Sequence, residues 1–107
     1  MATVRIDDPA EMNVLGLFLA ERLRAHEGPC RLRGALTIDA GGMRATILFE
    51  EDGMTVSRRD VAARCEISAP FPLLIEALLR PRLSTLLRVK VRGGRIFALR
   101  AMRMLQP

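Results

Sequence analysis

The sequence predicts an α+β fold in which a mainly antiparallel sheet of five strands is combined with helices. Residues 34–68 carry short strand patterns separated by Gly41-Gly42 and Asp52-Gly53, an arrangement typical of an antiparallel meander. Helical patterns lie on both sides of this region, and a last strand is followed by one more helix. A chain of 107 residues is long enough for one hydrophobic core and too short for two. We therefore expect residues 1–107 to form a single domain.

The composition is that of a folded globular protein. Hydrophobic residues make up 50% of the chain and charged residues 27%, and the mean hydropathy of +0.16 indicates a surplus of apolar surface. No apolar run approaches the roughly 18 residues that a membrane span needs, and residues 1–12 lack the apolar centre of a signal peptide. These features predict a soluble, cytoplasmic protein.

The first helix is predicted to start at residues 8–11. This segment has an acid in the capping position, a proline in the first turn and a second acid three residues after the cap. Apolar residues then recur three or four positions apart on one face: Met12, Leu15, Leu19 and Leu23, with Val14 and Phe18 widening the stripe. The pair Gly28-Pro29 is expected to end the helix.

Four strands are predicted in the middle of the chain, at residues 36–39, 43–49, 55–57 and 63–67. The second alternates apolar and polar positions and is expected to be half buried. Asp52-Gly53 is the strongest hairpin signal in the sequence, so it should join the second strand to the third. The pattern does not identify the neighbours of the fourth strand.

The second half of the chain predicts a helix at residues 71–80, a short helical turn at 82–87 and a fifth strand around Val89 and Val91. Lys90 and Arg92 should face outward from that strand. After Gly93-Gly94, a helical wheel of the last helix places Arg95, Arg100 and Arg103 on one arc, with Ile96 and Leu99 in or beside it. The opposite, broad apolar arc contains Phe97, Ala98, Ala101, Met102, Met104 and Leu105.

Catalytic chemistry has little support in the sequence. Cys30 and Cys65 are too few for a disulfide framework and are not spaced as a zinc or redox pair, so we expect free thiols. His26, the single histidine, excludes a site of several histidines and is most simply a helix-end residue. The acids at residues 50–52 lie in a hairpin turn, where solvation explains them. We expect no catalytic residues, no metal and no cofactor.

The positive charge raises the question of nucleic-acid binding, since all but one of the 17 cationic residues are arginine. A late cluster follows the last acid, Glu76: Arg80, Arg82, Arg88, Lys90, Arg92, Arg95, Arg100 and Arg103. Aromatic residues that could stack on bases are nearly absent, and no nucleic-acid-binding motif is present. We therefore expect no specific nucleic-acid binding, and at most transient contact with an anionic membrane surface.

Four segments, taken in order, resemble the SCP2 (sterol carrier protein 2) domain family. They are GALTIDAGG at 34–42, ATILFEEDGMTV at 45–56, AARCEISAPFPLLIEALL at 62–79 and VKVRGGRIFALRAMRML at 89–105. The last resembles the family's final strand, glycine turn and helix with an Ala-Met-basic step. The similarity lies in order and spacing along nearly the whole chain. Arg64, where the family often has an aspartate, and the RPRLSTLLR segment at 80–88 depart from it near the mouth of the family's cavity.

The resemblance implies an SCP2-like sheet with helices covering one face and an apolar tunnel between them. It implies non-catalytic binding or carriage of a hydrophobic small molecule or lipid, such as a fatty acyl chain, a sterol-like molecule or an isoprenoid lipid. We expect the tunnel to be lined by Phe18, Phe71, Leu74, Leu78, Phe97, Ala101, Met102 and Leu105. Two alternatives stay open: these residues are ordinary core, or the apolar last helix forms a protein-interaction surface, including a homodimer.

Overall fold

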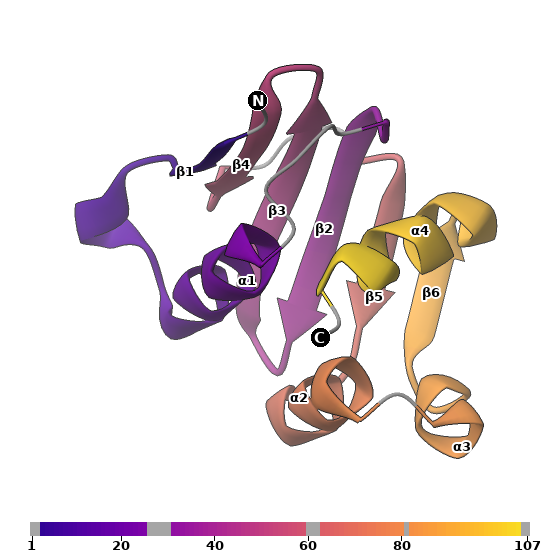
Figure 1. Cartoon of the computed structure of the whole chain (residues 1–107). Coiled ribbons are helices and arrows are strands. Elements are labelled where there is room, and N and C mark those ends of the chain that lie inside the picture. The colour runs from indigo at the N-terminus through magenta and orange to yellow at the C-terminus, as the bar shows by residue number, and fades with distance from the viewer. Residues whose placement is uncertain (1–2, 26–30, 60–62, 81, 106–107) are drawn as a thin grey trace.

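The computed structural model describes residues 3–25, 31–59, 63–80 and 82–105. Its strands form one sheet of order β1-β4-β3-β2-β5-β6 (Figure 1). The strands are β1 (Thr3–Ile6), β2 (Gly34–Ala40), β3 (Met43–Glu50), β4 (Gly53–Ser57), β5 (Cys65–Ser68) and β6 (Lys90–Gly93). The helices are a 3-10 turn η1 (Pro9–Glu11), α1 (Val14–Arg24), α2 (Phe71–Leu79), α3 (Leu83–Leu86) and α4 (Arg95–Leu105). The predicted α+β class is confirmed.

The sheet has six strands where the sequence predicted five, because β1 was missed. β1 is four residues long and pairs in parallel with β4, with Val4 opposite Met54 and Ile6 opposite Val56. So short a segment carries little periodicity, and its partner lies some fifty residues away in the chain. Arg5 lies between Val4 and Ile6 in β1, and its guanidinium is 3.3 Å from the Asp52 carboxylate. Its hydrogen bond lowers the pKa of Asp52.

The predicted meander is confirmed in β2, β3 and β4. Gly41 and Gly42, with φ of 62° and 100°, turn the chain between β2 and β3. Asp52 lies in the turn between β3 and β4 and Gly53 begins β4, so the hairpin forms where expected. β2 also pairs in parallel with β5, which begins at Cys65 rather than at residue 63. Three of the strand pairings are therefore antiparallel and two are parallel.

Helices α1 and α4 cover the same face of the sheet, α1 over β1, β3 and β4, and α4 over β5 and β6 (Figure 1). α2 and α3 lie at one end of the sheet. The covered face is apolar in every strand because the register aligns Leu36 with Ile47 and Ile38 with Ala45. The core lies between this face and the helices, as expected for helices packed on one side of a sheet.

The start of the first helix was predicted wrongly. Asp8 has a positive φ of 54° and makes no side-chain cap, and the 3-10 turn that follows ends at the extended residue Met12. α1 starts only at Val14, and the Asn13 side chain accepts a 2.8 Å hydrogen bond from the Gly16 N–H. Val14 is 65% exposed and does not widen the apolar stripe, whereas Leu15 and its successors at Leu19 and Leu23 are buried.

The last helix has the buried arc that the sequence predicted. Phe97, Ala98, Ala101, Met102 and Leu105 are buried, and Ile96 and Leu99 are exposed. Lys90 and Arg92 in β6 are also exposed, as expected. The predictions for His26, Gly28-Pro29 and Cys30 lie outside the described residues.

Removing the α1 cap should destabilise the protein. Asn13→Ala is expected to lower the free energy of unfolding by about 1–2 kcal/mol, because the Gly16 N–H loses its acceptor. Asn13→Ser should retain most of the stability, since serine caps about as well as asparagine. Chemical denaturation of both variants measures the difference. Equal stability of the two variants would contradict this capping role.

Gly93 and Gly42 provide a matched test of the contact between β5 and β6. Their φ angles are similar, 96° and 100°, but a Cβ on Gly93 would lie 2.5 Å from the Arg64 carbonyl oxygen, whereas one on Gly42 would meet open space. Gly42→Ala should cost about 1–3 kcal/mol from backbone strain. Gly93→Ala should cost roughly 1–3 kcal/mol more, because the main chain must move. Thermal or chemical unfolding showing equal losses would argue against a tight contact at Gly93.

Candidate ligand-binding site

The predicted tunnel residues gather in and around the single cluster between the sheet and the helices. Leu74, Leu78, Phe97, Ala101, Met102 and Leu105 are buried in this cluster, and Phe18 and Phe71 are partly buried against it. The predicted positions therefore lie close to one another in the fold. Their contact with a ligand remains a prediction.

Aromatic contacts join several of these residues to their surroundings. The Phe18 and Phe71 rings, from α1 and α2, lie 6.4 Å apart between centroids. Phe97 meets Phe49 of β3 edge to face, at 6.0 Å and 89°, a favourable geometry for two rings. The Arg22 Nε–H of α1 donates a 2.9 Å hydrogen bond to the Leu105 carbonyl at the end of α4. These contacts join α1 to α2 and α4, and α4 to the sheet.

An apolar pocket of about 430 Å³ lies between α4 and the edge strand β6, and we call it the apolar groove. It is lined by Leu87, Val89, Val91, Ala98, Leu99 and Met102, with Arg95 as its charged member. Val89 and Met102 are buried, whereas Leu87 and Leu99 are 76% and 58% exposed. The groove is thus a space with buried apolar walls and exposed leucines.

The groove and the predicted tunnel share Met102 and differ in their other residues. The sequence placed Leu99 in or beside the arginine arc and Leu87 in a helical turn, so neither was a candidate. One signal was available, because the apolar residues of α4 extend around more of the helix than contact with the sheet requires. The position of β6 beside α4, which forms the second wall, is a property of the folded chain.

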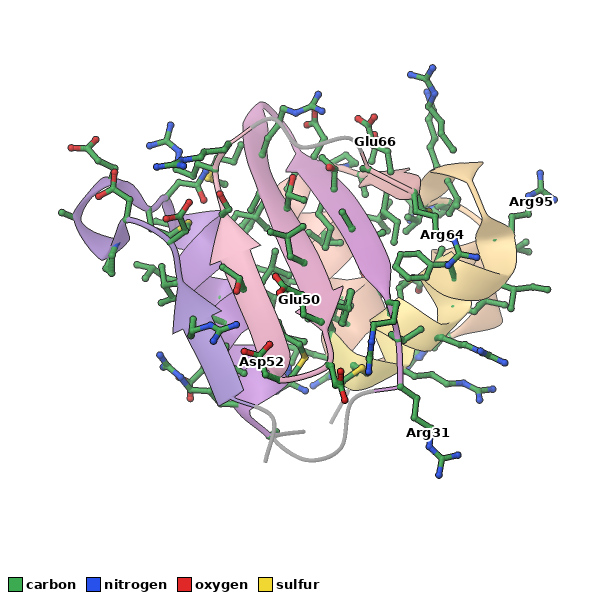
Figure 2. The ribbon with its side chains drawn as sticks, turned by 90° about the horizontal axis from the view of Figure 1, so that it is seen from above. Arg31, Glu50, Asp52, Arg64, Glu66 and Arg95 are labelled. Atoms are coloured by element: carbon green, nitrogen blue, oxygen red, sulfur yellow. The ribbon has the colours of Figure 1, made fainter. Side chains whose placement is uncertain are left out.

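A second pocket, of about 480 Å³, lies beside the start of α4, and we call it the arginine pocket. Its lining includes Arg31, Arg33, Arg64, Arg95 and Arg100, together with Leu32, Gly94, Ile96 and Phe97. The Arg64 guanidinium lies over the Phe97 ring, with its carbon 5.1 Å from the ring centroid. Figure 2 shows Arg64 beside α4, with Arg31 and Arg95 extending away from the body of the molecule on either side of it.

The sequence recognised part of this second pocket. Arg95 and Arg100 belong to the late arginine cluster, but Arg31, Arg33 and Arg64 come from segments that precede β2 and β5. Pairing of β2 with β5 brings these segments together. Phe97, expected in the tunnel, lines this pocket with one part of its surface while remaining 5% exposed.

Cys65 is a free thiol, as the sequence predicted, and is 2% exposed at the start of β5. Burial in the core, followed by the nearby Glu66 charge, raises the pKa of this thiol. A raised pKa keeps the thiol protonated at neutral pH and lowers its reactivity. Its position in the apolar core is consistent with packing rather than nucleophilic chemistry.

None of the helices among the described residues is long and apolar enough to cross a membrane. No family model matches this sequence, and no curated protein matches it.

Three solved structures share the fold of this chain. A protein described as UbiJ-SCP2, a ubiquinone synthesis protein, is 18% identical, with a TM-score of 0.59 over 89% of this chain and 80% of the other. A structure of sterol carrier protein 2 is 16% identical, with a TM-score of 0.56 over 88% of each chain. A Thermus thermophilus protein, described as possibly a sterol carrier protein, is 18% identical, with a TM-score of 0.52 over 98% of this chain and 90% of the other. The arrangement of strands and helices in this chain is an SCP2-like fold.

Proposed function

We propose that this protein binds a hydrophobic ligand, such as an acyl or isoprenoid chain, without transforming it, and that the apolar groove holds the ligand. The observation that carries the proposal is the pairing of buried walls at Val89 and Met102 with the exposed side chains of Leu87 and Leu99. Two proteins with this fold are described as a sterol carrier protein and as possibly one, which supports a carrier role.

The groove is large enough for such a ligand. Its volume of about 430 Å³ falls within the roughly 300–1,000 Å³ of small-molecule sites. Apolar burial contributes about 25 cal/mol per Å², so a chain that removes about 200 Å² from water gains about 5 kcal/mol before ordering costs. Met102 is suited to such a wall because its unbranched side chain can adapt to ligands of different shape.

The lining of the groove favours binding over catalysis. Arg95 is the charged residue among the described lining residues, and a guanidinium stays protonated at ordinary pH. General acid-base chemistry needs a group that exchanges a proton near the working pH. A carrier or presenting function requires only the apolar walls.

A second candidate function is a protein-interaction surface, including a homodimer, formed by the same part of α4. Leu99 is 58% exposed and lines the groove together with Leu87, and Ile96 of the same helix is 72% exposed. Exposed apolar side chains that cluster in this way are typical of docking surfaces as well as of ligand grooves. The two functions differ in whether the surface is covered by a small molecule or by another chain.

Leu99→Gln tests the groove, with Leu17→Gln as its control. Both leucines are exposed helical residues, but Leu17 lies on α1, away from the groove. Titration with a fluorescent long-chain fatty acid should show saturable binding to the wild type. Leu99→Gln should raise Kd roughly tenfold, because a leucine contact of about 60 Å² contributes about 1.5 kcal/mol. Leu17→Gln should bind like the wild type.

Failure of the folded wild type to bind long-chain fatty acids or isoprenoid alcohols would contradict the proposal, as would equal weakening by the two substitutions. Size-exclusion chromatography with light scattering on the same samples addresses the second candidate. A dimer that Leu99→Gln dissociates and Leu17→Gln leaves intact, without ligand binding, would establish the interaction surface instead.

Met102 and Ile47 give a second comparison, of stability with affinity. Ile47→Ala should reduce the free energy of unfolding by about 2–5 kcal/mol, because Ile47 is fully buried in the centre of the sheet. Met102→Ala should reduce it less, since part of this side chain borders the groove and already lacks packing partners there. Fatty-acid affinity should fall in Met102→Ala and stay unchanged in Ile47→Ala. Equal destabilisation with unchanged affinity in both would show that Met102 is plain core.

A further inference from the structure

We propose that the arginine pocket binds a phosphate group, either a free phosphate compound or the phosphate of an amphiphile. This is a second site, separate from the apolar groove, and it does not depend on the groove being occupied. The pocket carries five arginines and no carboxylate among its described lining residues.

The main chain fixes where these arginines stand. The Arg64 N–H donates a 2.9 Å hydrogen bond to the Ala35 carbonyl, which ties the residue before β5 to β2. The Arg64 carbonyl in turn accepts a 3.4 Å hydrogen bond from the Gly94 N–H, immediately before α4. The segment carrying Arg31 and Arg33, the residue Arg64 and the first turn of α4 are therefore held together by backbone contacts.

Three arginines of the pocket, Arg64, Arg95 and Arg100, have no ion-pair partner among the residues that the structure describes. Elsewhere in the described part of the chain, Arg5, Arg24, Arg44 and Arg59 each lie within ion-pairing distance of an aspartate or glutamate. Other arginines outside the pocket, such as Arg80, have no such partner among the described residues, so what distinguishes the pocket is the number of arginines that line one space. Several positive charges around one pocket raise the local electrostatic potential, which favours the binding of an anion.

The Arg64 side chain is already held in place before an anion binds. Its guanidinium is stacked over Phe97, and its Nη1–H donates a 3.3 Å hydrogen bond to the Arg33 carbonyl. These contacts restrict the side chain, so less conformational entropy is lost when an anion binds. A guanidinium has five N–H donors, which leaves several of them for a ligand.

The start of α4 adds a second source of positive potential. Gly94, Arg95, Ile96 and Phe97 line the pocket, and α4 continues for 11 residues from Arg95. The N–H groups of a first helical turn lack acceptors within the helix, and the helix dipole favours negative charge at this end. Phosphate suits the pocket because its several oxygens accept paired hydrogen bonds from arginine. The volume of about 480 Å³ leaves room for more than one phosphate.

Arg95 lines both the arginine pocket and the apolar groove. The phosphate could therefore belong to a free compound, or to the head of an amphiphile whose chain lies in the groove. The arginines would recognise the phosphate in the same way in both cases. Comparing the affinity of a phosphate that carries an alkyl tail with that of a phosphate without a tail distinguishes the two.

Isothermal titration calorimetry at low ionic strength with inorganic pyrophosphate and with an alkyl phosphate below its micelle concentration tests the proposal. Arg100→Gln is the principal variant because the Arg100 side chain is exposed, so its replacement should leave the fold intact, and Arg64→Gln is the second. Arg80→Gln is the control: it removes the same charge from the late cluster, after α2 at the other end of the sheet (Figure 1).

The wild type should bind both probes saturably, at one per chain. Arg100→Gln and Arg64→Gln should each weaken binding about tenfold, the effect of one charge-assisted contact, and Arg80→Gln less than about twofold.

If the alkyl phosphate binds more tightly than pyrophosphate, and Leu99→Gln removes this difference in affinity, the result supports the site and indicates that the phosphate is the headgroup of an amphiphile. Equal binding of the two probes would support it with a free phosphate compound. Absence of saturable binding by both probes would overturn the proposal, as would equal weakening by Arg100→Gln and Arg80→Gln. The proposal would also be overturned if a single-stranded oligonucleotide bound and pyrophosphate did not, and if all arginine variants lost the same oligonucleotide affinity. That result would indicate a nucleic-acid-binding surface instead of a phosphate site. Pyrophosphate binding without fatty-acid binding would contradict the proposed function and leave this site standing.

Discussion

Gly93 brings the end of β6 against the main chain of Arg64, and this contact determines where α4 begins. The φ of 96° at Gly93 and the short distance to the Arg64 carbonyl leave no space for a side chain. The next residue, Gly94, donates its N–H to the same carbonyl, and Arg95 starts the helix. Because α4 starts here, one of its flanks faces β6 and another faces the segments that precede β2 and β5. The apolar groove and the arginine pocket both follow from that placement.

α4 consequently has three different surroundings around its axis. Ala101 and Leu105 are fully buried on one side of α4, and their packing holds this helix to the sheet and to α1. Leu99 and Met102 line the apolar groove, whereas Ile96 and Arg100 line the arginine pocket. A hydrophobic ligand and an anionic group would thus be bound by one helix without competing for the same side chains, except at Arg95.

The uncovered face of the sheet is polar and is stabilised by its own contacts. The Thr37 and Thr46 hydroxyls lie 2.9 Å apart across β2 and β3, and both residues are buried. Arg44 lies 3.5 Å from both Asp39 and Glu66. Exposed ion pairs of this kind stabilise a protein only weakly. They give partners to charged groups on the face of the sheet opposite α1 and α4.

Elements that depend on local signals were predictable from the sequence. Asp52-Gly53 specified a hairpin, and the spacing of Leu15, Leu19 and Leu23 specified the buried side of α1. The order of strands and helices was sufficient to indicate the SCP2-like fold. The parallel pairings of β1 with β4 and β2 with β5 could be found only in the folded chain, because partners distant in the chain leave no local pattern. The same is true of both pockets: Arg31, Arg64 and Arg100 are far apart in sequence and become neighbours only when β2, β5 and α4 are placed side by side.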